Sequence, residues 1–274
     1  MTQPLNPLDV AGRFANRRVL VSGGGRGIGE ATARRAAREG ADVLLVARTA
    51  SEIDAVAASI VDDGGRAWAY AADVADPAQV DAVVVAAGER WGGIDVLVNC
   101  AGFGYTSPFL DFPDEEWRRV MGVNLNGAFM MAQRVARVMA ASGGGSIVHV
   151  SSIAGFAADG DEGAYNASKA GMRGLNSTMA RELARHGIRS NLIAPGYTAT
   201  PLTRDFLGEA MFEYVMNDFD RIPQRRMATP EEIAAAILFL ASDDASAVNG
   251  SELIVDGGTL ANLYVVETLP SLDT

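Results

Sequence analysis

Residues 17–29 read RRVLVSGGGRGIG, and this stretch decides the fold. An apolar run after the two arginines is typical of a buried parallel strand, which ends at Ser22. A glycine-rich turn follows, and helical periodicity then continues to about Glu39. Such a turn can hold a phosphate on backbone N–H groups at the positive end of the helix dipole. The glycines fit neither the G-x-G-x-x-G spacing nor the P-loop, so the turn alone does not identify a ligand.

The same alternation of apolar runs and helical stretches continues along the chain. Further candidate strands lie near residues 41–47, 67–71, 94–99, 145–151, 188–194 and 251–256. Candidate helices lie near residues 51–63, 77–90, 114–141, 163–187 and 230–241. Together with the first strand, this pattern predicts a single-domain α/β protein with a doubly wound Rossmann fold, in which helices cover both faces of a seven-stranded parallel sheet. Ligands of such sheets bind beyond the carboxyl ends of the strands.

Composition excludes several classes of function. The 274 residues carry a formal charge of −11 and show no Lys/Arg cluster, so we expect neither nucleic acid nor an anionic membrane as a partner. No apolar stretch approaches the ~18 residues of a membrane span, and the first ten residues lack a signal-peptide pattern, which predicts a cytoplasmic protein. One cysteine and two histidines supply too few ligands for a metal site.

A second motif, YNASK, stands at residues 165–169. Lys169 is the only lysine among 23 basic residues, which indicates that this position needs a compact ammonium group. Four residues apart on a helix, Tyr165 and Lys169 share a face, and a nearby ammonium lowers a phenol pKa from its usual value of about 10. Tyr165 is therefore a candidate acid–base group. The alternative is a core tyrosine beside an exposed lysine.

Taken together, these motifs resemble those of the short-chain dehydrogenases/reductases. SGGGRGIG at residues 22–29 matches the family's Thr/Ser-Gly-x-x-x-Gly-x-Gly turn, and NCAG at residues 99–102 is similar to its Asn-Asn-Ala-Gly. The resemblance extends over residues 17–258 and implies a single domain with a substrate lid at about 201–223. Residues 1–16 are then a leader, and residues 259–274 are an extension.

The resemblance implies four catalytic residues, namely Asn124, Ser152, Tyr165 and Lys169. In ketone reduction Tyr165 would supply the proton and Ser152 would hydrogen-bond the substrate oxygen. Lys169 would lower the pKa of Tyr165 and bind the nicotinamide ribose, while Asn124 would hold a water. Ser152 precedes Tyr165 by 13 residues, the separation that the family uses. The weaker candidates are Ser151 and Asn126.

The end of the second strand indicates which coenzyme is bound. Enzymes that bind NAD usually carry a carboxylate there, but this strand ends VART at residues 46–49 and has its Asp42 at the opposite end. Arg48 could face the 2′-phosphate of NADP, with Arg26 approaching from the glycine turn, so we expect NADP(H) rather than NAD(H). The alternative is that Arg26 and Arg48 are both solvated loop residues that contact no coenzyme.

The coenzyme-binding residues that the resemblance implies follow the strand ends. They are Ser22, Gly23, Gly25, Arg26, Gly27, Ile28, Gly29, Arg48, Asp73, Val74, Asn99, Ala101, Gly102, Tyr165, Lys169, Pro195, Gly196, Thr198 and Thr200. Thr198 would act through its backbone N–H group. Asp73 could also cap the helix that begins near Pro77, and the two roles do not exclude each other. Cys100 is not expected to be catalytic, because apolar surroundings keep a thiol protonated.

The implied activity is the NADP(H)-dependent interconversion of a ketone and a secondary alcohol, and we expect an apolar small molecule as the substrate. The expected pocket residues are Phe103, Tyr105, Ile153, Phe156, Tyr197, Phe206 and Met211. Apolar residues between 206 and 215 recur with a helical period, which predicts either a lid over the substrate or packing on the body of the protein. Asp159, Asp161 and Glu162, just ahead of Tyr165, would disfavour an anionic substrate at the rim of the pocket, unless they form a solvated loop.

Two other activities remain open. A 3-oxoacyl-[acyl-carrier-protein] reductase needs a basic rim for its acidic carrier, and residues 140–145 contain no cation, although Arg185, His186 and Arg189 are a partial substitute. A catalytically inactive NADPH-binding sensor would be expected to lack the Ser, Tyr or Lys. Family members pair through the helix near 163–187, so we expect a homodimer or homotetramer. Ala167, Gly171 and Gly174 leave room there, unless they pack on the chain's own sheet.

Overall fold

The computed structural model describes residues 12–158 and 160–262, and its centre is one parallel sheet. The strands are β1 (Arg18–Ser22), β2 (Asp42–Ala47), β3 (Arg66–Ala71), β4 (Val96–Asn99), β5 (Gly145–Val150), β6 (Ile188–Pro195) and β7 (Glu252–Val255). They lie in the order β3-β2-β1-β4-β5-β6-β7, which confirms the predicted seven-stranded Rossmann-like sheet. The order reverses between β1 and β4, and a crevice for a ligand is expected at that point.

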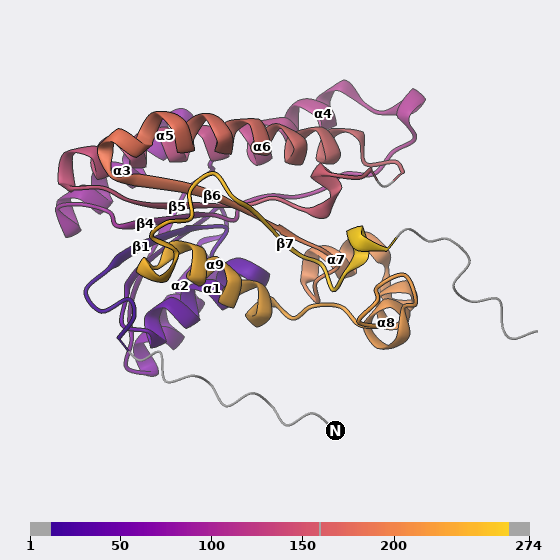
Figure 1. Ribbon diagram of the computed structural model, residues 1–274, viewed down its shortest axis with the longest axis horizontal. Helices are drawn as coiled ribbons and strands as arrows, with labels where there is room; N and C mark the ends of the chain where they lie inside the picture. Colours follow the sequence, from indigo (N-terminus) through magenta and orange to yellow (C-terminus); the bar gives the residue numbers. More distant parts are fainter. Residues whose placement is uncertain (1–11, 159, 263–274) are drawn as a thin grey trace, which may run out of the picture.

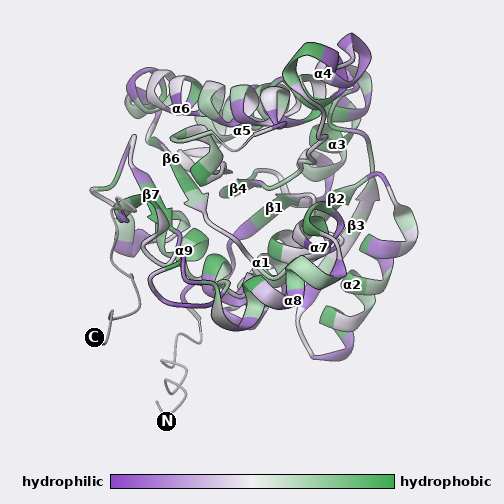
Figure 2. Cartoon of the chain, turned by 90° about the vertical axis from the view of Figure 1, so that its right-hand side faces the viewer, coloured by the Kyte–Doolittle hydropathy of each residue, from purple (hydrophilic) through white to green (hydrophobic). Residues whose placement is uncertain are grey.

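Helices cover both faces of the sheet (Figure 1). One layer contains α1 (Gly27–Arg38), α2 (Ala50–Asp62) and α9 (Pro230–Ala241). The other contains α3 (Pro77–Trp91), α4 (Asp114–Met121), α5 (Ala128–Ser142) and α6 (Gly163–Leu183). Side chains alternate between the two layers, since Val19 and Val21 belong to one core and Leu20 to the other. Both cores are apolar, which explains why the strands are continuous apolar runs (Figure 2).

The predicted helix at 114–141 is interrupted. Between α4 and α5 the chain forms a π-helical turn over Gly122–Gly127, and π turns of this kind are frequent at functional sites. Asn124, inside the turn, is fully buried. Its side chain accepts a hydrogen bond from the Phe103 backbone N–H (3.0 Å) and donates to the Ser168 hydroxyl (3.1 Å). Asn126 is exposed, which agrees with the preference for Asn124 as the buried amide.

The predicted lid consists of two short helices, α7 (Pro201–Leu207) and α8 (Glu209–Asp218), beyond the end of the sheet (Figure 1). Gly208 separates them with a φ of 71°, a conformation that favours glycine. The break shifts the helical phase, so the apolar stripe expected from a single helix is wrong. Phe212 and Val215 are buried in a small separate core, whereas Tyr214 is exposed.

The small residues of α6 do not all face outward. A β-carbon at Gly171 would lie 2.8 Å from the Leu125 side chain, so Gly171 packs on its own chain, whereas one at Gly174 would meet nothing within 4 Å. Pairing of two subunits through this helix stays a prediction. None of the helices in residues 12–158 and 160–262 has the length and apolar character of a transmembrane span. Asp159, residues 1–11 of the expected leader and residues 263–274 of the extension lie outside the described residues.

Candidate active site

A cleft of about 470 Å³ lies at the carboxyl ends of the strands, where the strand order reverses. Its wall contains all but three of the predicted coenzyme-binding residues. These lining residues are Gly23, Gly25, Arg26, Gly27, Ile28, Arg48, Asp73, Val74, Ala101, Gly102, Tyr165, Lys169, Pro195, Gly196, Thr198 and Thr200. Residues far apart in the sequence thus meet in one groove, because parallel strands end at the same edge of the sheet.

The other three residues lie beneath the cleft and hold its floor together. The Ser22 hydroxyl accepts hydrogen bonds from the backbone N–H groups of Cys100 (3.2 Å) and Ala101 (3.3 Å). The Asn99 amide donates to the Ala128 carbonyl (3.0 Å). Gly29 packs against the turn itself, since a β-carbon there would overlap the carbonyl oxygen of Gly23. Ser22, Asn99 and Gly29 therefore position the cleft and do not line it.

The glycine turn fits the phosphates of a dinucleotide. Gly23 has a φ of 70°, and a β-carbon there would lie 2.8 Å from the Ala101 backbone, so only glycine brings the two strand ends this close. Gly27 begins α1, and N–H groups at the first turn of a helix are free to bind an anion. We therefore find that the residues present fit a bound nicotinamide dinucleotide.

Charged side chains surround the turn. Arg26 and Arg48 are both exposed at the cleft and have no ion-pair partner among the residues that the structure describes. The sequence analysis missed Glu52, in the first turn of α2, which also lines the cleft. Its carboxylate oxygen would lie 3.1 Å from a β-carbon on Gly25. Glu52 was missed because a carboxylate was expected only at the end of β2, whereas Glu52 lies in the helix that follows.

Asp73 lines the cleft and does not cap α3. The Asp73 carboxylate accepts a hydrogen bond from the Ala75 backbone N–H (2.9 Å), whereas the cap of α3 is Asp76, which accepts from the N–H groups of Ala78 and Gln79. The expected second role of Asp73 as a helix cap is therefore wrong. Its carboxylate is left beside the cleft, where a ligand group could contact it.

Ser152, Tyr165 and Lys169 come together at one end of the cleft. Tyr165 and Lys169 lie one turn apart on α6, with the Lys169 ammonium 5.4 Å from the centre of the Tyr165 ring. Lys169 is only 4% exposed and donates a hydrogen bond to the Val150 carbonyl (2.9 Å). Ser152 lies close enough to Tyr165 for its hydroxyl to favour the ionised phenol and so to lower the pKa of Tyr165. Ser151 instead donates to the Lys169 carbonyl (3.1 Å), which leaves Ser152 as the serine that faces the tyrosine.

The prediction that Lys169 lowers the pKa of Tyr165 is wrong for the coenzyme-free protein. Burial raises the pKa of Tyr165 to about 12, the charge of Glu162 adds to the rise, and the Ser152 hydrogen bond opposes it. Burial also lowers the pKa of Lys169 to about 8. Both effects follow from the cost of charge in a poorly solvated site. Tyr165 therefore holds its proton at neutral pH, as a proton donor must.

The half-buried Cys100 of the cleft wall and the fully buried His149 are not reactive groups. Burial raises the pKa of the Cys100 thiol to about 11 and lowers the pKa of His149 to about 4. At neutral pH Cys100 is therefore a thiol and His149 an uncharged imidazole. This agrees with the expectation that Cys100 is not a nucleophile. No group of three or more His, Cys, Asp or Glu residues that could hold a metal occurs in the described parts of the chain.

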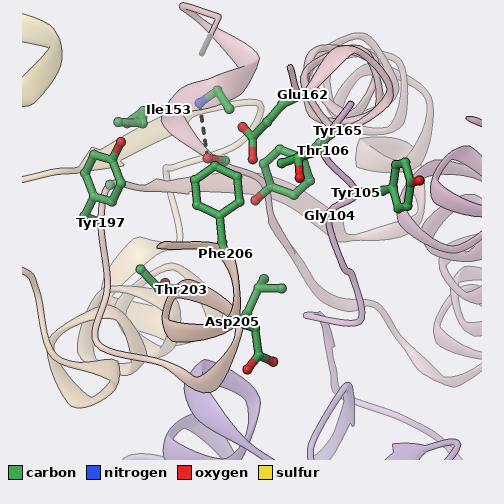
Figure 3. A pocket seen from close by; sticks show the side chains of 14 residues that line it. Gly104, Tyr105, Thr106, Ile153, Glu162, Tyr165, Tyr197, Thr203, Asp205 and Phe206 are labelled. Carbon is green, nitrogen blue, oxygen red and sulfur yellow. Dashed lines mark hydrogen bonds between the residues drawn. The ribbon is translucent and has the colours of Figure 1, made fainter. Parts of the chain in front are cut away.

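A second cavity of about 340 Å³ adjoins Ser152 and Tyr165 (Figure 3). Four of the predicted pocket residues line it, namely Tyr105, Ile153, Tyr197 and Phe206. Glu162, expected at the rim, also lines the cavity, as do Leu202, Thr203 and Asp205 from the expected lid, whereas Thr106 was not predicted. Most of the lining side chains carry a polar atom, and among the described residues no lysine or arginine lines the cavity. The cavity is therefore more polar than the expected apolar pocket.

Three predicted pocket residues lie elsewhere. Phe103 lines the coenzyme cleft, and its ring lies 4.5 Å from the Arg119 guanidinium. Phe156 packs against the Arg173 guanidinium at 4.0 Å and does not line the cavity. Met211 is 48% exposed on α8 and is also absent from the cavity wall. The expectation that these residues line the substrate pocket is corrected accordingly.

The lowered pKa of Lys169 predicts a stability effect. Because the folded protein binds this proton less tightly than the unfolded chain, ionised Lys169 destabilises the fold below pH 8, and the penalty disappears as pH rises from about 8 towards 10.5. We expect Lys169→Met to raise the free energy of unfolding by about 2 kcal/mol at pH 7, after the loss of the bond to Val150 is allowed for. Urea unfolding of the coenzyme-free protein at pH 7 and pH 9.5 measures this gain. A gain that does not shrink at pH 9.5 contradicts the prediction.

Known proteins resemble this chain over most of its length. Residues 23–259 match the family model described as Enoyl-(Acyl carrier protein) reductase. An L-rhamnose 1-dehydrogenase (NAD(P)(+)) of Azotobacter vinelandii is 40% identical over 90% of this chain and 98% of its own length. A 3-oxoacyl-[acyl-carrier-protein] reductase of Synechocystis is 37% identical over 87% of this chain and 95% of its own length.

Solved structures agree with the fold. The crystal structure of levodione reductase matches with a TM-score of 0.86 and 36% identity, over 90% of this chain and 99% of that one. A short-chain type dehydrogenase/reductase from Mycobacterium marinum matches equally well, with a TM-score of 0.86 and 35% identity over 91% of this chain and 97% of that one. With the glycine turn, the Ser152–Tyr165–Lys169 group and these likenesses in agreement, the chain belongs to the short-chain dehydrogenase/reductase family of oxidoreductases.

Proposed function

We propose that the protein is an NADP(H)-dependent oxidoreductase that interconverts a ketone and a secondary alcohol. The observation that carries the proposal is that Ser152 and Tyr165 line both cavities. A coenzyme bound in the cleft and a substrate bound in the second cavity would therefore meet at these two hydroxyls. When bound, the nicotinamide coenzyme supplies a hydride for ketone reduction and accepts one in the reverse direction.

The chain's own residues would manage the proton and the developing charge. Tyr165 would give its phenolic proton to the substrate oxygen, and Ser152 would hydrogen-bond that oxygen as negative charge grows on it. Lys169 would add a buried positive charge to the site. Asn124 would act as a positioning residue, because its amide is bonded to Phe103 and Ser168, in addition to the expected water-holding role.

The proposed coenzyme preference rests on Arg26 and Arg48, with Glu52 as the opposing carboxylate. We expect Arg48→Asp to weaken NADPH binding by about 10- to 100-fold and to change NADH binding by less than about threefold, because a charged hydrogen bond to the 2′-phosphate contributes about 1.5–3 kcal/mol. Titration of the fluorescence of each reduced coenzyme measures both dissociation constants. Arg38→Asp makes the same charge change at an exposed position on α1 away from the cleft. Equal losses for NADPH and NADH in Arg48→Asp contradict the proposed preference.

The substrate hypothesis changes with the polar cavity. An apolar ketone offers no hydrogen-bond donor to the carboxylates and hydroxyls that line the cavity, which disfavours binding. Consumption of NADPH and of NADH at 340 nm should therefore be measured with simple ketones, hydroxylated ketones and a 3-oxoacyl thioester. Turnover of ketones supports the proposal. Coenzyme binding without turnover of any compound, in either direction, favours the sensor instead.

A 3-oxoacyl-[acyl-carrier-protein] reductase is the second candidate, and similarity to the Synechocystis protein of that name favours it. Residues 140–145 contain no basic residue, which disfavours docking of an acidic carrier protein there. A thioester that is reduced much faster than every free ketone would select this candidate.

A further inference from the structure

Ser168 is a buried hydroxyl to which the proposed chemistry gives no role. It stands between Tyr165 and Lys169 in the sequence of α6, is 0% exposed, and lines neither of the two described cavities. A buried hydroxyl needs hydrogen-bond partners, and Ser168 has two. It donates to the backbone carbonyl of Tyr165 (2.7 Å) and accepts from the side-chain amide of Asn124 (3.1 Å).

The backbone of Phe103 fixes the direction of these hydrogen bonds. Its N–H group can only donate, so the Asn124 atom that it meets at 3.0 Å is the amide oxygen. The amide nitrogen of Asn124 then donates one hydrogen to the Phe103 carbonyl (2.9 Å) and the other to Ser168. Ser168 must accept that hydrogen and give its own to the Tyr165 carbonyl. Each bond of this chain therefore has a single direction.

Back-bonding within the helix does not by itself explain Ser168. A serine inside a helix often donates to a carbonyl one turn earlier, and the exposed Ser177 does so with the Arg173 carbonyl (3.1 Å) on the same helix. Such a bond uses only the hydroxyl proton and requires no burial. What distinguishes Ser168 is the bond that it accepts from another element, the π-helical turn Gly122–Gly127 that contains Asn124.

The hydrogen bonds join two walls of the candidate active site. Phe103 lines the coenzyme cleft, and Gly104 lines the second cavity. On the other side, Tyr165 lines both. The two walls are in close contact, since a β-carbon on Gly104 would lie 3.7 Å from a ring carbon of Tyr165 (Figure 3). Asn124 and Ser168 thus form a hydrogen-bonded bridge between these walls.

We propose that Ser168 is a positioning residue, which acts through Asn124 to hold the Phe103–Gly104 segment at a fixed distance from Tyr165. This inference rests on the proposed function. Proton donation by Tyr165 requires that substrate, coenzyme and phenol are aligned, and a displacement of about 1 Å can lower a rate by about 100-fold. Loss of the bridge is therefore expected to slow the chemical step while both cavities persist. Ser168 itself touches no reacting atom.

Single-turnover kinetics test the inference. Enzyme loaded with NADPH is mixed with saturating cyclohexanone or 2-hydroxycyclohexanone, whichever the wild type reduces faster, and the decay at 340 nm is recorded. The amplitude measures the fraction of competent enzyme, and the rate constant measures the chemical step. We expect Ser168→Ala to lower the rate constant about tenfold and to change the dissociation constant of NADPH by less than about threefold. Ser177→Ala is the matched control, because it removes a back-bonded hydroxyl from the same helix, and its rate constant should stay within about twofold of the wild type.

A double-mutant cycle tests the path through Asn124. Asn124→Ala removes the same hydrogen bond from its other end, so adding Ser168→Ala to Asn124→Ala should change the rate constant by less than about twofold. Two effects that multiply instead show that Ser168 acts independently of Asn124, which contradicts the bridge. If Asn124→Ala does not fold, the comparison of Ser168→Ala with Ser177→Ala decides.

Two further results overturn the inference while the proposed function stands. A Ser168→Ala variant with a reduced amplitude but the wild-type rate constant shows that the hydroxyl only stabilises the fold. Equal losses of rate in Ser168→Ala and Ser177→Ala show that the bond from Asn124 has no special effect. Absence of turnover by the wild type, with any ketone and either coenzyme, overturns the proposed function and this inference together.

Discussion

Replacement of Tyr165 by phenylalanine is expected to lower kcat for ketone reduction by about 10²- to 10⁴-fold, the usual contribution of a positioned acid. The substitution removes only the hydroxyl and leaves the ring where the two cavities meet. With the pKa of Tyr165 raised to about 12, this hydroxyl carries a proton throughout the neutral range. NADPH binding is expected to change by less than about threefold, because the hydroxyl is one contact among many. Steady-state kinetics and coenzyme fluorescence measure the two effects.

Tyr70→Phe is the matched control for this variant. It removes the same atom from a tyrosine on β3 that packs against the hydrophobic core away from both cavities. Its kcat should stay within about twofold of the wild type, because the loss of a hydroxyl away from both cavities changes the stability of the protein and not the chemistry of the site. A Tyr165→Phe variant that retains wild-type turnover removes Tyr165 from the role of proton donor. Loss of NADPH binding in that variant assigns the hydroxyl to the coenzyme site instead.

The features that the sequence predicted well depend on contacts that are local or repeated. The parallel sheet follows from apolar runs at regular intervals, and the cleft follows because every strand ends at the same edge. Ser152 and Ser151 are adjacent, yet the separation from Tyr165 that the family resemblance implies indicated the one that faces the tyrosine. These predictions needed no knowledge of how helices pack against one another.

The features that the sequence missed depend on tertiary packing. Gly208 shifts the helical phase between α7 and α8, so the residues that face the cavity could not be read from one continuous period. Glu162 could be read from the sequence either as a rim residue or as a solvated loop residue, and only the fold shows that it is buried. The pKa of Tyr165 rises for the same reason, since spacing on a helix reveals a neighbouring ammonium but not the loss of water around the phenol.

The glycine turn connects fold and function through Gly29. This glycine lies in the first turn of α1 and approaches Gly23 so closely that no side chain fits between them. The same approach sets the direction in which α1 leaves the sheet and the place of its N-terminal N–H groups. Ser22, one residue before Gly23, simultaneously binds the end of β4. These two contacts together fix the junction of β1, β4 and α1 on which the coenzyme cleft is built.

Gly29→Ala is expected to lower the free energy of unfolding by about 3 kcal/mol or more, because the added β-carbon would overlap the Gly23 carbonyl oxygen, a backbone atom that cannot rotate away. Gly88→Ala is the control, since a β-carbon there meets nothing within 4 Å in the interior of α3, and it should raise stability by about 0.5–1 kcal/mol. Urea unfolding of the two coenzyme-free variants beside the wild type measures both changes. If Gly29→Ala unfolds at the wild-type urea concentration, α1 can move away from the turn at little cost, and the close packing of the two glycines does not fix the junction.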